Sequence, residues 1–340
     1  MTINSRASRP TSIGVSGHDN ARVMAWYVRL LFIAATALIP SKLETQEVPP
    51  VPAGRVRIHV PSSLDGSVQD SYLTLPSSAR AKPSKRRPLA VLLHTWSNDL
   101  EQRQPEVEVE AEARDWLLLA PNFRGRNDHP EACGSRYAQQ DILDAVEWVR
   151  KHHAVDERRI YLLGLSGGGF MTMLMAARHP QTWAAASAWV GISNLSAWYD
   201  EHRSDDYGTM LRGCFGGGPT DGEKIAAAYR EQSPLTHLRP GLPVALDIAA
   251  GKDDDSVSVR HTLWAFRALA PNALSEAEIA AFKTSSRSQQ AQSAAKMDPS
   301  LGRRILLQRT AGDCRITIFD GGHEWFPKAA IEWLARHHRS

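Results

Sequence analysis

Short apolar runs that alternate with amphipathic stretches limit most strongly how this 340-residue chain can fold. Leu89–Leu93 and Trp116–Ala120 are continuous apolar runs, which is typical of parallel strands that are covered on both faces. Between such runs, apolar residues recur three and four positions apart, as they do at Ile142, Val146 and Val149. The alternation predicts an α/β fold: a doubly wound, mostly parallel sheet with helices on both faces.

The pattern predicts a complete set of elements within one domain, residues 55–340. The expected strands are Arg55–Val60 and Tyr72–Leu75, as an antiparallel pair, then Leu89–Leu93, Trp116–Ala120, Ile160–Leu163, Ala184–Val190, Val244–Ala250 and Arg315–Phe319. The expected helices are Glu101–Arg114, Tyr137–His152, Gly168–Arg178, Val257–Leu269 and Lys328–His337. Two segments interrupt the series. Residues 191–240 are predicted to form a cap-like insertion over the sheet edge, and residues 271–303 a helical surface insertion.

The N-terminal part differs from the rest. Arg29 precedes Leu30–Ile39, and ten apolar or small residues behind positive charge suit a signal peptide better than a membrane span, which needs about 20. A buried helix is the alternative. We expect residues 1–42 to be a disordered segment plus a signal peptide and residues 43–54 to be a Pro-rich linker. The protein is then secreted or periplasmic, with no stable membrane span after processing, and cytoplasmic if the run is not a signal.

Charge and cysteine content exclude some classes of function. The net charge is +3 and the Lys and Arg residues are spread along the chain, so no nucleic-acid partner is expected. Cys133, Cys214 and Cys314 form no C-x-x-C pair and no metal-ligand cluster, so neither a metal nor a cofactor is expected. Export would permit a Cys133–Cys214 disulfide, although the sequence does not place the two residues side by side.

Ser166 lies in the run Gly164-Leu165-Ser166-Gly167-Gly168. A serine hydroxyl is a weak nucleophile, and acyl-transfer enzymes expose it on a sharp turn beside a base. The pattern is weak by itself, but a strand candidate precedes it and the helix candidate Gly168–Arg178 follows it, which is the context that such a turn requires. A glycine-rich structural turn is the alternative. The context predicts that Ser166 is a nucleophile.

These residues also carry a family resemblance. Gly164–Gly169 between that strand and helix, together with Ser233-Pro234-Leu235 later in the chain, resembles the α/β-hydrolase fold. Within that fold it is similar to the catalytic domain of the prolyl-oligopeptidase-like branch. The resemblance covers about residues 55–340, which leaves no room for the propeller of the large peptidases in that branch.

His323 is the candidate base. In this fold the order along the chain is Ser, then Asp or Glu, then His. His323 follows the last expected strand and precedes the last expected helix, and Gly321 and Gly322 let its loop carry the imidazole to the nucleophile. An ordinary surface histidine is the alternative.

Three consecutive aspartates after the strand candidate Val244–Ala250 compete for the role of the acid that orients the base. Their chemistry leaves the choice open. The resemblance implies Asp254, because the family pattern G-x-x-D-x-x-V is matched by Gly251, Asp254 and Val257. We expect Asp253 and Asp255 to be loop and N-cap residues.

An oxyanion hole needs two N–H donors, and Gly167 after the nucleophile supplies one of them. The other comes from the loop after Leu89–Leu93. Relatives usually have His-Gly there, whereas this chain has His94-Thr95-Trp96-Ser97 and no glycine to adopt positive φ. We predict that the Trp96 N–H donates, with Thr95 as the second choice, and that His94 organises the loop.

Substrate contacts are predicted from position at the sheet edge where ligands bind. Arg124, after Trp116–Ala120, is expected to meet a carboxylate or sugar hydroxyls; an Asp of the following loop is the alternative partner. An aromatic platform for a sugar or phenolic group is expected from Trp96, Trp198, Tyr199 and Trp325. Packing beneath the 191–240 insertion is the alternative for each.

The sequence therefore predicts a serine hydrolase that uses Ser166, Asp254 and His323 through an acyl-enzyme. This machinery leaves the cleaved bond open, because esters and amides share it. The export signal, the short cap and the aromatic residues favour a small-molecule or oligosaccharide ester, such as an acetyl or feruloyl ester on plant polysaccharide. A peptidase acting on short peptides is the alternative. An inactive hydrolase-fold binding protein is a remote one, supported only by the missing glycine.

Overall fold

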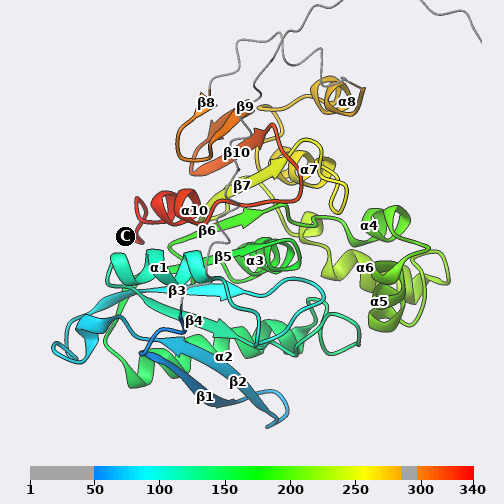
Figure 1. Ribbon diagram of the computed structural model, residues 1–340. Coiled ribbons are helices and arrows are strands. Elements are labelled where there is room, and N and C mark those ends of the chain that lie inside the picture. The colour runs from blue at the N-terminus through cyan, green and yellow to red at the C-terminus, as the bar shows by residue number, and fades with distance from the viewer. Residues whose placement is uncertain (1–49, 285–296) are drawn as a thin grey trace, which may run out of the picture. The chain divides into compact units, whose positions relative to one another are not determined.

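A ten-stranded sheet forms the centre of the structure, a computed structural model that describes residues 50–284 and 297–340 (Figure 1). In spatial order its strands are β1 (Arg55–Pro61), β2 (Val68–Thr74), β4 (Leu117–Pro121), β3 (Arg87–Leu93), β5 (Val155–Leu165), β6 (Ala185–Trp189), β7 (Ala245–Gly251), β10 (Cys314–Phe319), β9 (Arg303–Ala311) and β8 (Met297–Asp298). The six strands from β4 to β10 are parallel, and the two at each edge are antiparallel. The predicted α/β-hydrolase sheet is confirmed.

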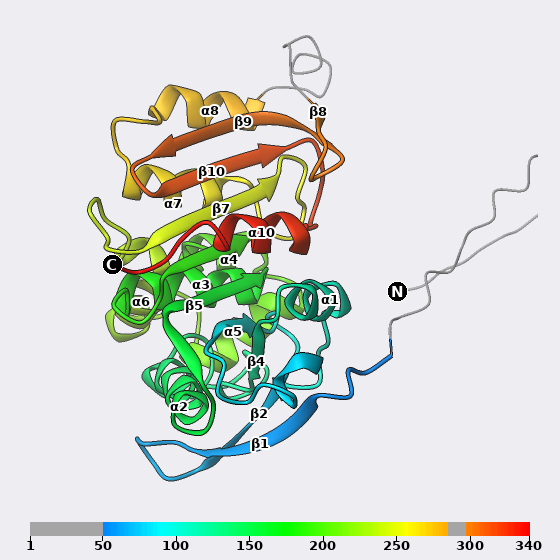
Figure 2. The ribbon, with the colours of Figure 1, turned by 90° about the vertical axis from the view of Figure 1, so that its left-hand side faces the viewer.

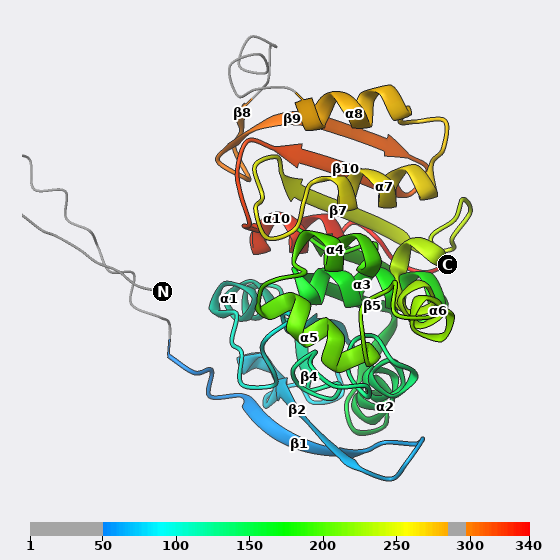
Figure 3. The ribbon, with the colours of Figure 1, turned by 90° about the vertical axis from the view of Figure 1, so that its right-hand side faces the viewer.

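Helices cover both faces of this sheet because successive residues of a strand point to opposite sides. Leu89, Val91 and Leu93 join the larger apolar core, whereas Ala90 and Leu92 join the smaller one. Two helices, α1 (Pro105–Ala113) and α10 (Pro327–Leu334), lie on the side of the smaller core (Figure 2). The opposite face carries α2 (Arg136–His152), α3 (Gly167–Arg178) and α7 (Arg260–Leu269) (Figure 3).

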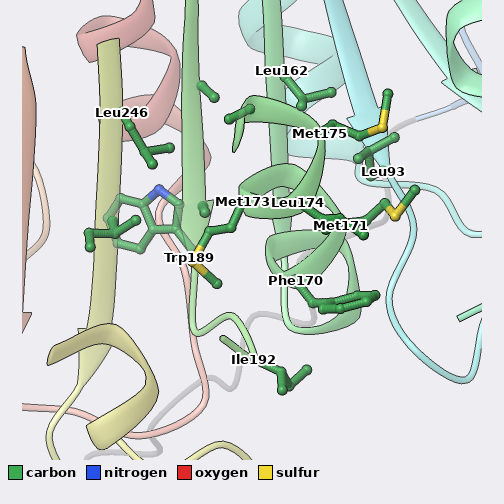
Figure 4. Packing of buried hydrophobic residues seen from close by; sticks show 14 of the residues in the cluster. Leu93, Leu162, Phe170, Met171, Met173, Leu174, Met175, Trp189, Ile192 and Leu246 are labelled. Atoms are coloured by element: carbon green, nitrogen blue, oxygen red, sulfur yellow. The ribbon is translucent and has the colours of Figure 1, made fainter. Parts of the chain in front are cut away.

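Helix α3 is enclosed on all sides. Every residue from Gly167 to Ala177 is buried. Met173 extends toward Trp189 of β6, and Met171 lies on the side of Leu93 of β3 (Figure 4). A helix that is packed this densely moves little, so the turn that precedes it rests on a rigid base.

Three short helices fill the expected insertion at residues 191–240. They are α4 (Leu195–Glu201), α5 (Asp206–Phe215) and α6 (Glu223–Gln232), and they lie together beside the sheet, where α4 follows the carboxyl end of β6 (Figures 1 and 3). A disulfide joins Cys214 of α5 to Cys133 in the loop after β4, with the Cα atoms 6.2 Å apart. The short 3₁₀ helices η1 (Ser77–Ala79) and η2 (Pro234–Thr236) complete the described connections.

The second expected insertion, residues 271–303, is only partly helical. Helix α8 (Glu276–Thr284) fits the expectation, but Met297–Asp298 and the start of Arg303–Ala311 are strands, and residues 285–296 lie outside the described part. Strand β9 was not predicted, because its residues are partly exposed and three of them are arginines. Helix α1 begins at Pro105 rather than at Glu101, as a proline at the first helical position favours.

No helix within residues 50–284 and 297–340 has both the length and the hydrophobicity that a bilayer crossing requires. The described residues belong to the unit Val48–Ser340. The run Leu30–Ile39, and with it the expected signal peptide, lies outside them.

Candidate active site

Ser166 stands on the turn between β5 and α3. Its backbone has φ 57° and ψ −122°, a conformation that costs a non-glycine residue about 1–3 kcal/mol. The Ser166 N–H donates to the Trp189 carbonyl at 2.9 Å, and the Phe170 N–H donates to the Ser166 carbonyl at 2.8 Å. The packed surroundings of α3 therefore hold Ser166 in a strained strand-to-helix turn, the geometry in which hydrolases of this fold present a serine.

Two glycines after Ser166 bring α3 against the end of β3. A Cβ atom at Gly167 would lie 2.2 Å from the Trp96 nitrogen, and one at Gly168 would lie 2.2 Å from the Leu93 carbonyl oxygen. Both neighbours are backbone atoms, which cannot turn away as a side chain can. The glycines thus allow the loop after β3 to approach Ser166.

The loops after β7 and β10 are joined by backbone hydrogen bonds, since these strands are neighbours in the sheet. The Lys252 N–H donates to the Phe319 carbonyl, and the Asp253 N–H donates to the Gly321 carbonyl, both at 2.9 Å. This pairing brings His323 to Asp254: the His323 Nδ1 atom lies 2.9 and 2.8 Å from the two carboxylate oxygens.

The Asp254 carboxylate is fully buried and is fixed by its own loop. The N–H groups of Ser256 and Val257 both donate to Asp254 Oδ1 at 2.9 Å. By contrast, Asp253 and Asp255 are exposed, and Asp253 pairs with Lys252 at 3.2 Å. The expectation that one of these two caps the next helix is wrong, because α7 begins at Arg260 rather than at Val257 and its N-cap is Val259.

Ser166, Asp254 and His323 each follow the carboxyl end of a parallel strand, which is the edge where ligands bind in such sheets. The His323 ring is 24% exposed and Ser166 is 7% exposed. Among the described residues no hydrogen bond joins Ser166 Oγ to His323 Nε2, so the structure joins Asp254 to His323 but not His323 to Ser166. Such contacts often shorten only when a substrate binds.

Two backbone N–H groups lie beside Ser166. That of Gly167 is at the first position of α3, where no intrahelical acceptor exists, and the Trp96 nitrogen lies against Gly167. Within residues 50–284 and 297–340 neither has a hydrogen-bond acceptor. The Thr95 N–H is already engaged, because it donates to Gln102 Oε1 at 2.8 Å. Of the two donors considered in this loop, Trp96 is therefore the available one.

The loop after β3 holds its shape without a glycine. None of His94, Thr95, Trp96 and Ser97 has positive φ. The Trp96 carbonyl accepts from the backbone N–H of Asn127 at 3.0 Å. His94 is buried, with Nε2 2.8 Å from the Asn122 carbonyl and its ring stacked on Phe123 at 3.8 Å.

Burial lowers the pKa of His94, which favours the neutral ring as an organiser of the loop. Sequence reasoning missed Gln102 and Asn127. No sequence pattern marks them: Gln102 binds Thr95 across seven residues of irregular loop, and Asn127 binds Trp96 from 31 residues away.

Arg124, the expected substrate contact, is engaged by two carboxylates of the protein. Its Nε atom lies 2.6 Å from Asp141, and its Nη1 atom lies 2.8 Å from Asp65. Burial acts to lower the pKa of Arg124, but these two hydrogen bonds outweigh it and raise that pKa. The guanidinium, 9% exposed, ties the loop after β4 to α2 and to the β1–β2 turn.

The expected aromatic platform is also absent from the described surface. Trp96 and Trp198 are each 1% exposed and pack edge to face with ring centroids 4.7 Å apart. Tyr199 is buried, and its hydroxyl accepts from Arg212 at 3.3 Å. Packing beneath the insertion thus accounts for three of the four rings, and only Trp325 is partly exposed.

No group of three or more His, Cys, Asp or Glu residues in the described ranges is arranged to hold a metal ion.

Known proteins resemble this chain in sequence over about half its length. It is 24% identical over 157 residues to the uncharacterized peptidase YtmA of Bacillus subtilis, a match that spans 45% of this chain and 58% of that protein. It is 30% identical over 174 residues to dipeptidyl aminopeptidase BIII of Pseudoxanthomonas mexicana, spanning 47% and 25%. A shorter match, 30% over 66 residues, is to acetylxylan esterase A of Aspergillus ficuum, spanning 19% and 22%.

The fold matches a known structure over a larger part of the chain than the sequence comparisons do. The structure of the Pyrococcus horikoshii acylaminoacyl peptidase superposes with a TM-score of 0.58 at 18% identity, covering 84% of this chain and 42% of that one. The model of the prolyl oligopeptidase family matches residues 113–294, just over half of the chain. That range contains Ser166 and Asp254, and His323 lies beyond its end. The chain is a serine hydrolase that belongs to the prolyl oligopeptidase family.

Proposed function

We propose that this protein is a serine peptidase that cleaves short peptides through an acyl-enzyme on Ser166. The observation that carries the proposal is the family match over residues 113–294. The relatives with the longer matches are named as peptidases, whereas the match to an acetylxylan esterase spans 19% of the chain. This proposal replaces the ester as the favoured substrate.

In the proposed reaction Ser166 Oγ attacks the carbonyl carbon of the scissile bond, and His323 Nε2 accepts its proton. Asp254 holds the other ring nitrogen at 2.8 Å, which fixes the tautomer and stabilises the imidazolium that forms. The imidazolium then gives its proton to the leaving amine. Water, deprotonated by the same ring, hydrolyses the acyl-enzyme and restores Ser166.

The negative charge of the tetrahedral intermediate is assigned to the N–H groups of Gly167 and Trp96. Both donors are backbone groups, and the segments that carry them, α3 and the loop after β3, are held in place by packing and hydrogen bonds before the reaction begins. Such preorganised donors are worth about 100- to 1000-fold in kcat each.

The test compares a panel of short peptide p-nitroanilides, blocked and free at the amino end, with sugar acetates and feruloyl esters. A fluorophosphonate probe should label the wild type, and Ser166→Ala should lose both labelling and turnover. Ser63→Ala, a change at an exposed position on the β1–β2 turn, is the matched control and should keep both. Turnover of sugar esters without any anilide cleavage would refute the peptidase proposal.

A carboxylic ester of a sugar is the second candidate. The similarity to acetylxylan esterase A favours it, and the machinery around Ser166 serves esters as well as amides. Unactivated sugar esters are the informative substrates, because activated phenyl esters react readily with either kind of enzyme.

We also propose that the protein is exported. The run Leu30–Ile39 behind Arg29 supports this, and so does the Cys133–Cys214 disulfide, since disulfides persist in oxidising compartments. Fractionation of cells producing the full chain tests it. Recovery only in the cytosolic fraction would contradict the proposal.

A further inference from the structure

The loop that carries Asp254 is bound from outside by two side chains of the insertion. The Ser256 carbonyl oxygen accepts from Trp198 Nε1 at 3.0 Å and lies 2.8 Å from His202 Nε2. A carbonyl oxygen only accepts, and so does the Asp205 carboxylate on the other side of the ring, so His202 donates to both only with a hydrogen on each ring nitrogen. Trp198 and His202 are four residues apart at the end of α4, which places them on one face of the helix. They occupy both lone pairs of this carbonyl.

His202 is itself oriented by Asp205. The Asp205 Oδ2 atom lies 2.6 Å from His202 Nδ1, and Oδ1 caps α5 by accepting from the N–H groups of Tyr207 and Gly208. Burial acts to raise the pKa of Asp205, but the hydrogen bonds from His202 and the Gly208 N–H outweigh it and hold that pKa below its ordinary value. Because His202 is 9% exposed, its ring has little freedom to turn away from Ser256.

The opposite side of the same peptide group faces Asp254. The Ser256 carbonyl and the Val257 N–H belong to one peptide unit, and in a trans peptide they point in opposite directions. The Val257 N–H donates to Asp254 Oδ1 at 2.9 Å. Hydrogen bonds to the carbonyl polarise the unit and strengthen its N–H as a donor. Trp198 and His202 thus act on the Asp254 carboxylate through the planar peptide between Ser256 and Val257.

Trp198 also contacts the other half of the site. Its ring packs edge to face on Trp96, whose N–H is the proposed second oxyanion donor. Helix α4 is in turn anchored to α7, where His261 lies 3.5 Å from Glu201. One helix of the insertion therefore touches both the acid loop and the oxyanion loop.

We propose that Trp198 and His202 are positioning residues that fix the Ser256–Val257 peptide and thereby hold Asp254 in place against His323. The inference rests on the proposed roles of Asp254 and His323. If the two donors are lost, the peptide is free to rotate, the carboxylate loses one of its two backbone donors, and the His323 ring is less well oriented. The loss falls on the chemical step rather than on substrate binding.

Two substitutions in the full chain separate these donors from packing. His202→Leu removes the contacts to Ser256 and Asp205, and Trp198→Phe removes the indole N–H while keeping an aromatic ring. Each should lower kcat by about tenfold with KM within about twofold, since an interaction that acts in the transition state changes kcat. His202→Gln, which keeps an N–H donor, should recover most of the loss.

Tyr207→Phe is the matched control. The Tyr207 ring packs on Trp198 and His202 at 5.0 and 5.1 Å, but its hydroxyl makes no hydrogen bond in the described part of the chain. Its kcat should equal that of the wild type. Thermal unfolding of every variant identifies any that fail to fold, and Trp198→Phe keeps the test decisive if His202→Leu is one of them.

A double-mutant cycle with Asp254→Asn distinguishes a positioning role from a purely structural one. The quantity measured is the rate of fluorophosphonate labelling. If His202 acts through Asp254, His202→Leu should cause no further loss of fluorophosphonate labelling rate in the Asp254→Asn chain. An equal loss in both backgrounds, or an unchanged kcat in the single variants, overturns the positioning role. If Asp254→Asn alone leaves kcat unchanged, it is the proposed function that fails.

Discussion

Gly167→Ala tests whether the close approach of α3 to the loop after β3 matters for catalysis. The new Cβ would lie 2.2 Å from the Trp96 nitrogen and 2.5 Å from its Cα, whereas ordinary contacts begin at 3.4 Å. One of the two backbones must therefore move by about 1 Å. The movement separates the Gly167 and Trp96 N–H groups, because each is attached to one of the two colliding segments.

The expected cost is the loss of one oxyanion donor, about 100- to 1000-fold in kcat. The substitution also costs stability: Gly167 has no positive φ, so alanine meets no backbone strain there, but forcing two buried backbones apart costs about 1–3 kcal/mol. Asp254 and His323 are held by other loops, so the base keeps its orientation. The melting temperature should fall by several degrees, so kcat is compared at a temperature where circular dichroism shows both proteins to be folded.

The assay combines kcat on the best substrate with the rate of fluorophosphonate labelling. Gly66→Ala is the matched control: Gly66 has φ 75° with open space around it, so alanine there costs about 1 kcal/mol of stability and no activity. If Gly167→Ala keeps kcat within about threefold of the wild type, the Trp96 N–H is not an oxyanion donor and the reasoning is refuted.

Three further predictions follow from single contacts. Asp254→Asn should lower kcat by about 10⁴-fold while Asp253→Asn leaves it unchanged; steady-state kinetics in which Asp253→Asn is the damaging change would contradict the assignment. Cys214→Ser opens a disulfide with a sequence separation of 81 and should lower the free energy of unfolding in urea by about 2–4 kcal/mol; an equal free energy of unfolding would contradict this. Burial acts to raise the pKa of Asp115, but hydrogen bonds from neighbouring Lys, Ser and Arg side chains hold it below its ordinary 3.8. Its stabilising contribution is thus complete above about pH 4 and is lost as the pH falls further, so Asp115→Asn should flatten the acid side of a stability–pH curve.

The centre of the fold was predictable because parallel strands that are buried on both faces are mostly apolar. Leu89–Leu93 and Ile160–Leu163 carry that signature without interruption. Strand β9 does not. Its Arg303 and Arg309 reach carboxylates of other segments, and a strand that is exposed on part of its surface shows no run that separates it from a loop.

The geometry of the candidate site was predictable where chain order constrains it, and not where the contacting residues are far apart in the sequence. Ser166 and His323 follow strand ends in the order that the fold requires. Arg124 has the same local sequence whether it faces a ligand or a carboxylate, and only the folded chain brings Asp65 and Asp141 to it. The sequence left the Cys133–Cys214 pairing undecided for the same reason, since the two cysteines are 81 residues apart and only the folded chain brings them together.

The loop after β3 lacks the usual glycine, yet its backbone still approaches Ser166 closely, because a glycine on the opposite segment leaves the space. A glycine in such a loop allows positive φ and a close approach of the backbone to the nucleophile. Here no residue from His94 to Ser97 has positive φ, and the close approach is permitted by Gly167 across the gap. Hydrogen bonds to Gln102 and Asn127 then fix the loop from two sides. The side chain of Trp96 packs against Trp198 and so joins the loop after β3 to the insertion.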